Sequence, residues 1–478
     1  MTESETEKSD TTHEPQLRRV MGPGLLLLFV VGDILGTGVY ALTGQVAQEV
    51  GGAAWLPFLV AFAIATITAF SYLELVTKYP QAAGAALYVH KAFGVQFVTF
   101  LVAFVVMCSG ITSASTASRF FAANFFTAFD FSWGKTGVVV LALLFMALLA
   151  VVNFRGVGES VKLNVALTFV EITGLAMVIL VGLWAFTGGG ADVDFARVVA
   201  FDTPAEKGTF LAITTATSLA FFAMVGFEDS VNMAEETKDP VRIFPKVLLT
   251  GLGIAGAVYV VVAIVAVALV PVGVLAESET PLIEVVKAGA PGLPIEAILP
   301  FISMFAVANT ALINMLMASR LIYGMARQHV LPPVLGVVHP RRHTPWVAII
   351  FTTLIAFGLI FYVSAVAGSG AIAVLGGTTS LLLLAVFAMV NIAVLVLRRD
   401  VRAAGEHFRT PTVMPVIGFF ASAYLVLPFA GRPAQQYLLA GGLVLIGVLL
   451  FGLTTLINRQ LGVRGAGITD PTHLGDAP

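Results

Sequence analysis

The chain has 478 residues, of which 58% are hydrophobic and only 11% are charged, with a net charge of −2. Soluble domains carry about 25% charged residues, and no soluble fold of this length hides so much apolar surface. Together with a mean hydropathy of +0.95, these values exclude a soluble globular protein and predict an all-α polytopic membrane protein.

The first 20 residues are polar and acidic, and they lack the basic region that opens a signal peptide, so residues 1–20 are expected to be a disordered cytoplasmic tail. A membrane-spanning helix needs about 20 apolar residues. The apolar segments between charged or Pro/Gly-rich breaks predict twelve such helices: 22–46, 53–77, 96–118, 137–154, 160–186, 209–236, 243–271, 295–326, 346–364, 370–397, 414–430 and 437–457. Residues 461–478 form a second cytoplasmic tail.

The distribution of basic residues agrees with twelve spans. Of the 26 lysines and arginines, 20 fall on the side of the N-terminus. The six on the opposite side are Arg119, Lys135, Arg197, Lys207, Lys287 and Arg432. Because cytoplasmic loops are enriched in basic residues, this bias predicts a multi-pass protein of the cell membrane (plasma or inner) with both termini in the cytoplasm.

The first span contains VGDILGTGVYALTG, residues 31–44, which would make a poor membrane helix. It holds the acid Asp33 and the glycines Gly32, Gly36, Gly38 and Gly44. Each interior glycine costs about 1 kcal/mol relative to alanine. Close helix packing explains an isolated glycine pair, whereas a real break is tolerated only where the backbone faces protein or a water-filled cavity.

A second irregular span favours the break. The sixth span reads SLAFFAMVGFEDSVNMAEETKDP, with Gly226 near its middle and Glu228 and Asp229 directly after it. Two successive acids facing lipid would be costly. A helix that ends near Gly226 and restarts beside Glu228 places both acids in a cavity instead.

The two irregular spans each begin a block of five spans, which is typical of inverted repeats with a substrate site at paired discontinuous helices. We therefore expect a 5+5 inverted-repeat core with discontinuous helices 1 and 6. Its repeats are residues 21–200 and 201–400, and the last two spans lie in residues 401–460.

The chemistry of such a site points to a zwitterion. The restarted helix after Gly36 exposes backbone N–H groups and a positive dipole end, which suit a carboxylate. The helix ends before Gly36 and Gly226 expose carbonyls, which suit an ammonium group. An α-amino acid carries both groups a few ångströms apart.

At these residues the sequence resembles the amino acid–polyamine–organocation family of transporters. GDILGTGVY resembles the family's first-helix motif, FSYLELVTKYPQAAGAALYVHKAFG its second-helix signature, FFAMVGFEDSVNMAEETKDPVRIFP its sixth-helix motif, and NMLMASRLIYGMARQHVLP the end of its eighth helix. The resemblance covers residues 20–460. It implies a ten-helix core of two inverted repeats, with two accessory helices in residues 401–460. It also implies alternating access by rocking, without sodium in most members.

The resemblance also assigns roles by motif position. The backbone of Gly36, Thr37 and Gly38 would bind the substrate carboxylate, and the carbonyls beside Gly226 and the first break, those of Ile34, Phe222, Ala223 and Val225, would bind the amine. Phe222 occupies the place of an aromatic lid. Glu228 occupies the place of a gating or pH-sensitive acid.

The fifth span departs from the family pattern. Sodium-independent members often have a lysine there in place of sodium, and in this register the residue is Glu171. Three interpretations are open: a protonatable carrier, a ligand for a bound cation such as sodium, or a neutral hydrogen-bonded structural acid. Asp33 lies one turn before the first break and needs polar partners, for which Asn309, Thr310 and Asn314 are candidates. It could serve coupling, structure or recognition of a basic side chain.

The remaining polar residues indicate no enzyme. We expect Glu74 to pair with Lys78 at i+4, and Thr112, Ser115 and Ser118 to serve helix packing. The sequence offers no phosphate loop, no metal-ligand spacing and no disulfide pair, because Cys108 is the single cysteine. No cofactor, metal or nucleic acid is expected.

The sequence thus predicts a secondary active amino acid transporter, sodium-independent and proton-coupled or exchanging. Its partners would be a small-molecule amino acid, protons and membrane lipid. The alternatives are a polyamine or other organic-amine transporter, and an amino acid sensor that binds without translocating. The scarcity of basic residues at mid-membrane favours neutral or cationic over acidic substrates.

Overall fold

The computed structural model describes residues 21–460 except for 82–83, 132, 156–159, 189–190, 205–206, 235–236, 293, 343 and 400–406. Both predicted tails, 1–20 and 461–478, therefore lie outside the described residues. Within the described chain every regular element is a helix, and β-pairing is limited to two isolated bridges. The all-α class predicted from composition is confirmed.

Most elements follow the predicted spans to within a few residues; the third span, predicted as 96–118, is wrong at its end, because α5 continues to Phe129. The first half contains α1 (Pro23–Ile34), α2 (Thr37–Val50), η1 (Gly52–Ala54), α3 (Trp55–Lys78), α4 (Gly84–Phe93), α5 (Gln96–Phe129), α6 (Gly134–Arg155), α7 (Ser160–Phe186) and α8 (Phe195–Val198). The second half contains α9 (Thr209–Ala220), η2 (Phe221–Met224), η3 (Asp229–Met233), α10 (Pro240–Leu269), α11 (Val272–Glu277), α12 (Pro281–Gly289), α13 (Ile295–Arg327), η4 (Pro333–Gly336), α14 (Trp346–Ala367), η5 (Gly368–Gly370), α15 (Ala371–Leu397), α16 (Val413–Val426), η6 (Pro428–Ala430) and α17 (Ala434–Gln460).

Eleven segments of the described chain are long and apolar enough to cross a membrane. The predicted span that does not reach this length is 414–430, where α16 has only 14 residues. At 1.5 Å per residue α16 is about 21 Å long, shorter than the ~30 Å hydrocarbon layer. The chain is therefore a multi-pass membrane protein.

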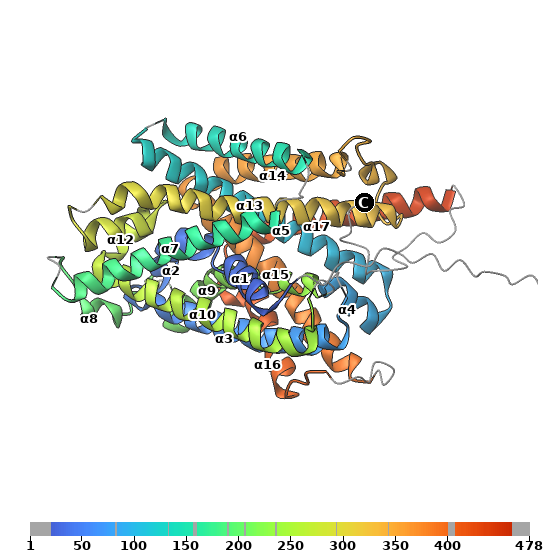
Figure 1. The fold of residues 1–478 in the computed structure, drawn as a ribbon, viewed down its shortest axis with the longest axis horizontal. Helices are drawn as coiled ribbons and strands as arrows, with labels where there is room; N and C mark the ends of the chain where they lie inside the picture. Colours follow the sequence, from blue (N-terminus) through green and yellow to red (C-terminus); the bar gives the residue numbers. More distant parts are fainter. Residues whose placement is uncertain are drawn as a thin grey trace, which may run out of the picture.

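The long helices run side by side in two groups (Figure 1). Helices α5, α6, α13 and α14 pack on one another in one group, and α1, α2, α3, α9 and α10 form the other. Helix α7 contacts α1, α10 and α13, while α15 contacts α3, α5 and α9, so these two helices connect the groups.

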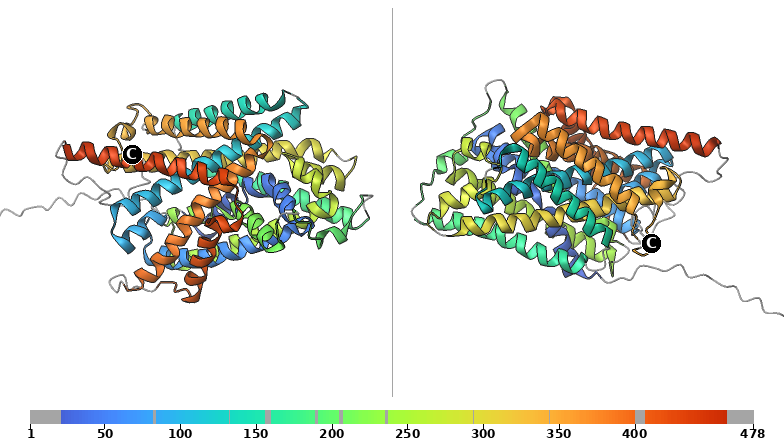
Figure 2. Two further views of the ribbon diagram at one scale, coloured as in Figure 1. Left: turned by 180° about the vertical axis from the view of Figure 1, so that it is seen from behind. Right: turned by 90° about the horizontal axis from the view of Figure 1, so that it is seen from above.

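The bundle has two distinct ends. Helices α8 and α12 lie at one end, and α4 lies at the other together with the last turns of α17 (Figures 1 and 2). We call them the α12 end and the α4 end. Helix α17 runs along the outside of the bundle (Figure 2), where several of its leucines, including Leu438 and Leu449, are well exposed. In a membrane such an apolar outer face contacts lipid.

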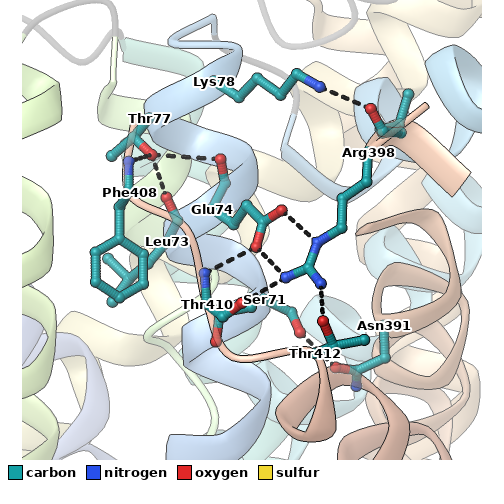
Figure 3. A network of polar contacts seen from close by, with 11 residues as sticks. Ser71, Leu73, Glu74, Thr77, Lys78, Asn391, Arg398, Phe408, Thr410 and Thr412 are labelled. Atoms are coloured by element: carbon teal, nitrogen blue, oxygen red, sulfur yellow. Dashed lines mark hydrogen bonds and ion pairs between the residues drawn. The ribbon is translucent and has the colours of Figure 1, made fainter. Parts of the chain in front are cut away.

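Glu74, near the last turn of α3, forms an ion pair that the i+4 rule does not predict. Its carboxylate accepts two hydrogen bonds from Arg398, just after α15: 2.8 Å from Nε and 2.6 Å from Nη2 (Figure 3). Lys78 instead donates to the backbone carbonyl of Leu397 at 2.6 Å. The expected Glu74–Lys78 pair is therefore wrong, because a bidentate guanidinium from a neighbouring helix satisfies both carboxylate oxygens. This bonding also raises the pKa of Arg398.

The same carboxylate anchors the segment before α16 (Figure 3). The Thr410 N–H donates to Glu74 Oε2 at 2.9 Å, and the Thr410 carbonyl accepts from Arg398 Nη2 at 2.6 Å. Phe408 donates its N–H to Thr77 Oγ1 at 3.0 Å and stacks on Phe70 with ring centroids 6.1 Å apart. Helix α3 is thus joined to α15 and to the entry of α16 at the α4 end.

We expect Glu74→Gln to destabilise the protein by about 2–4 kcal/mol, because Arg398 loses its charged partner and the Thr410 N–H faces a donor. This should lower the apparent Tm in detergent by on the order of 5 °C. The matched control is Glu284→Gln, since Glu284 pairs with Lys287 at a half-exposed site. Equal shifts in the two variants would show that the Glu74 network contributes nothing special.

Candidate substrate-binding site

The first membrane segment is broken where the glycines predict. Helix α1 ends at Ile34, and α2 begins at Thr37 after Leu35 and Gly36. The Tyr259 hydroxyl donates to the Ile34 carbonyl, which supplies one partner at the broken end. No side chain caps the start of α2, so its first backbone N–H groups remain available.

The sixth segment is broken too, in a different form from the expected one. Helix α9 ends at Ala220, and η2 continues it as a 3-10 turn. Val225 is extended, and Gly226 has φ +121°, a conformation that only glycine adopts readily. The chain then resumes as the 3-10 turn η3 rather than as an α-helix. The end of the predicted span, residues 235–236, lies outside the described residues.

The two breaks touch each other. A Cβ atom on Gly38 would overlap the backbone Cα of Ala223, and a Cβ on Gly226 would lie 2.7 Å from the carbonyl oxygen of Asp33. Both glycines are therefore needed for close backbone approach. The free N–H groups of α2 and the carbonyls around Gly226 consequently lie at one place in the bundle.

A small cavity of about 20 Å³ lies at this crossing. It is lined by Asp33, Ile34, Gly36, Thr37, Gly38, Ser113, Phe222, Val225, Gly226, Asp229, Thr310 and Asn314. The volume is close to that of one ordered water. All the predicted substrate-binding residues line it except Ala223, which packs directly against Gly38.

A larger cavity of about 120 Å³ extends from this crossing toward the α4 end. Val225, Asp229 and Asn314 line both cavities, so the two adjoin. Glu228 lines the larger one, and its Oε2 accepts the backbone N–H of Gly226 at 2.9 Å. The two acids thus border cavities, and Glu228 also stabilises the broken backbone.

The α12 end is closed by direct contacts. Lys207 pairs with Glu49 at 2.7 Å, and Arg119 pairs with Glu279 at 3.4 Å. The backbone around Gly51 packs against the segment 197–202, where the Ala53 N–H donates to the carbonyl of Ala200. Burial raises the pKa of the Glu279 carboxyl, opposed by the charges of Arg119 and Lys135. Of the two cavities described above, the larger one approaches the site from the α4 end.

Glu171 lies in α7, fully buried, and lines neither cavity. Within the described chain neither of its carboxyl oxygens has a hydrogen-bond partner. Its backbone carbonyl accepts the Tyr40 hydroxyl at 3.0 Å. Among the described residues, Glu171 therefore has no hydrogen-bond partner that would support its interpretation as a structural acid.

Asp33 does not form the hydrogen bonds expected from the sequence. Its Oδ2 is buried without a partner among the described residues, although Thr310 and Asn314 line the same cavity. The Asn314 amide donates instead to the Thr310 carbonyl at 2.9 Å and faces Ser113 Oγ at 3.5 Å. Asn309 is buried in α13 and lines neither cavity.

Sequence reasoning missed three tyrosines and a serine. Tyr259 and Tyr40 donate to the backbone at α1 and α7, Tyr72 lines the larger cavity, and Ser113 lines the small one. A tyrosine inside an apolar span is a usable signal, because its buried hydroxyl needs an acceptor. Ser113 gives none, since hydroxyls in membrane helices usually serve packing.

A helical membrane bundle in which two interrupted helices meet over a polar cavity defines the class of membrane transporters. The comparison with known families identifies the particular family of transporters. A family model described as amino acid permease matches residues 26–451, so the chain belongs to this family of the amino acid–polyamine–organocation superfamily.

Three relatives illustrate the range of the family. The chain is 30% identical to cationic amino acid transporter 9 of Arabidopsis thaliana, a chloroplastic protein, over 70% of this chain and 60% of the relative. It is 24% identical to the methylthioribose transporter of Bacillus subtilis over 91% and 93% of the two chains. It is 23% identical to the branched-chain amino acid permease BcaP of the same species over 94% and 96%. These relatives are transporters rather than enzymes.

We expect Gly226→Ala to destabilise the protein by about 2–3 kcal/mol, because alanine at φ +121° is strained and its Cβ would press on the Asp33 carbonyl. The apparent Tm and the yield of monodisperse protein measure this. The control is Gly253→Ala in α10, where a Cβ meets nothing within 4 Å and helix propensity improves. A neutral Gly226→Ala would contradict the close approach of the two breaks.

Proposed function

We propose that this protein is a secondary active amino acid transporter whose unwound backbone at the two breaks binds the substrate's carboxylate and amine. The observation that carries the proposal is the contact between the breaks, at Gly38 with Ala223 and at Gly226 with Asp33. Nearly all the residues that the resemblance assigns to substrate binding line the small cavity at that contact.

The carboxylate would bind at the start of α2. Backbone N–H groups there have no side-chain cap, and the helix dipole of 14 residues favours an anion. The amine would bind the backbone carbonyl oxygens of Ala223 and Val225. It would also donate to the carbonyl oxygens of Ile34 and Phe222, each through its second lone pair. The latter two already accept bonds, from the Tyr259 hydroxyl and the Val225 N–H.

Alternating access would provide the room that the substrate needs. The cavity at the crossing has the volume of a water, so a bound amino acid requires the helices around it to separate. The closed α12 end and the cavity toward the α4 end are what one state of such a cycle requires. Phe222, which packs beside Gly376 of α15, would close over the substrate.

The proposed topology follows from charge. Lys78, Arg320 and Arg398 lie at or near the α4 end, so that end would face the cytoplasm of a cell membrane, with both termini on that side. Helix α16 with η6 would be a short twelfth span. The two broken segments would begin two inverted repeats of five spans, and α16 and α17 would be accessory.

The acids at the site favour neutral or cationic amino acids. Asp33 and Asp229 line the small cavity and Glu228 the larger one, whereas Arg320 is the one basic residue that the described chain contributes to either. An acidic side chain would meet repulsion there. A polyamine would be attracted, which is why an organic-amine carrier is the second candidate.

Coupling to protons is proposed to act through Glu171. A carboxylate without solvent or a donor is costly inside a membrane, and both Glu171 oxygens lack partners among the described residues. Tyr40 links its backbone to α2, so a change at Glu171 would reach the helix that binds the carboxylate. Sodium is not required in this proposal.

Proteoliposomes with labelled arginine, leucine, glutamate and putrescine test the function. We expect saturable uptake of arginine or leucine and none of glutamate. Uptake of putrescine alone would replace the proposal with a polyamine carrier. Substrate-dependent thermal stabilisation without uptake or counterflow would indicate a sensor.

Glu171→Gln tests the coupling. We expect an inward proton gradient to stimulate uptake at least threefold in the parent chain and not at all in Glu171→Gln, while substrate counterflow persists. The control is Glu284→Gln, a half-exposed acid in α12 that lines neither cavity. Equal stimulation in the parent and Glu171→Gln would remove Glu171 from the coupling step.

A further inference from the structure

Arg432 is a buried arginine in the connection between α16 and α17. The sequence counts it among six basic residues on one side of the membrane, yet it is only 6% exposed. It forms no ion pair with any described acid. All its bonds run to neutral oxygen atoms, so its role is not that of a surface charge.

The guanidinium of Arg432 has five N–H bonds, and the structure provides five acceptors. Nε donates to the Leu425 carbonyl at 2.6 Å. Nη1 donates to the Gly377 carbonyl and to Gln436 Oε1, both at 2.9 Å. Nη2 donates to Ser380 Oγ at 2.9 Å and to the Ser218 carbonyl at 3.4 Å. Every N–H bond of this buried guanidinium therefore has an acceptor, which offsets part of the cost of burying it without a carboxylate.

These acceptors belong to four helices. Leu425 is in α16 and Gln436 in α17, Gly377 and Ser380 are in α15, and Ser218 is in α9. Ser380 strengthens the junction, because its hydroxyl donates to the Ser218 carbonyl at 2.5 Å. A Cβ on Gly377 would run into the Gln436 side chain, so the glycine provides the space for this cluster.

The junction lies next to the proposed substrate site. Ser218 is one helical turn before Phe222, just where α9 loosens into η2. Gly376, adjacent to Gly377, faces the Phe222 ring, and a Cβ there would lie 3.4 Å from it. Phe222 lines the small cavity. Arg432 therefore bonds to both segments that set the position of Phe222: the end of α9 at Ser218, and α15 at Gly377 and Ser380.

We propose that Arg432 is a positioning residue for the substrate site: through Ser218 and the Gly377–Ser380 turn of α15, it fixes Phe222 over the bound substrate. It thereby gives the two accessory helices a part in substrate recognition. This inference rests on the proposed function of the site. Lysine cannot replace arginine here, because a single ammonium has three donors and no planar fork.

The test combines Arg432→Lys with Phe222→Ala in a double-mutant cycle of transport kinetics. We expect Arg432→Lys to raise KM about tenfold, with Vmax per folded protein changed less than twofold. In the Phe222→Ala background the same substitution should change KM less than twofold, since the residue it positions is absent. Arg242→Lys, at an exposed arginine paired loosely with Asp239, is the control and should leave KM unchanged.

A purely structural role predicts a different result. Arg432→Lys would then lower the yield or the apparent Tm and leave KM unchanged. Alternatively, it would raise KM by the same factor in the parent chain and in the Phe222→Ala background. Either outcome overturns the proposal. If Arg432→Lys does not fold, Ser380→Ala replaces it. That variant removes one acceptor and the Ser218 bond, and should shift KM in the same direction.

A readout independent of transport separates this inference from the proposed function. With Cys108 replaced by alanine, Ser113→Cys places a thiol in the small cavity. Arg432→Lys should raise its rate of alkylation by a small maleimide at least threefold, because the Phe222 side of the cavity loosens. Absence of amino acid uptake by the parent chain contradicts the proposed function, whereas an unchanged alkylation rate contradicts the role of Arg432.

Discussion

The contact between two interrupted helices is the constraint on which the rest of this structure depends. Backbone N–H and carbonyl groups cannot be left facing lipid, so the breaks at Gly36 and Gly226 can exist only where other protein surrounds them. The bundle provides that setting by pressing Gly38 against Ala223 and Gly226 against Asp33. Tyr259 and Glu228 then each supply one hydrogen bond to the freed backbone.

Polar groups elsewhere in the bundle follow the same rule by two routes, and Glu171 is an exception. Glu74 and Arg398 neutralise each other at the α4 end and anchor the entry of α16 (Figure 3). Arg432 keeps its charge and is surrounded by neutral acceptors from four helices. Both carboxyl oxygens of Glu171 lack a hydrogen-bond partner in the described chain, unlike those of Glu74.

Helix α15, which connects the two groups of helices, distributes its polar bonds unevenly among its neighbours. In the described chain, Arg398, just after α15, and Asn391 within it bond to side chains of α3, whereas α15 makes one side-chain bond to α9, from Ser380 to the Ser218 carbonyl, and one to α5, between Thr379 and Thr112 at 2.7 Å. Among the described residues, the polar bonds of α15 are therefore concentrated on α3.

The sequence by itself determined the membrane class, the positions of most long helices and the position of the first break. These features are local: apolar length sets the spans, and glycines beside an acid weaken a helix whatever surrounds it. The tertiary structure decided the form of the second break, the partner of Glu74, 324 residues away along the chain, and the burial of Arg432. A polar side chain bonds to whatever donors and acceptors the fold brings within 3 Å, and spacing along the chain carries no information about which helices those are.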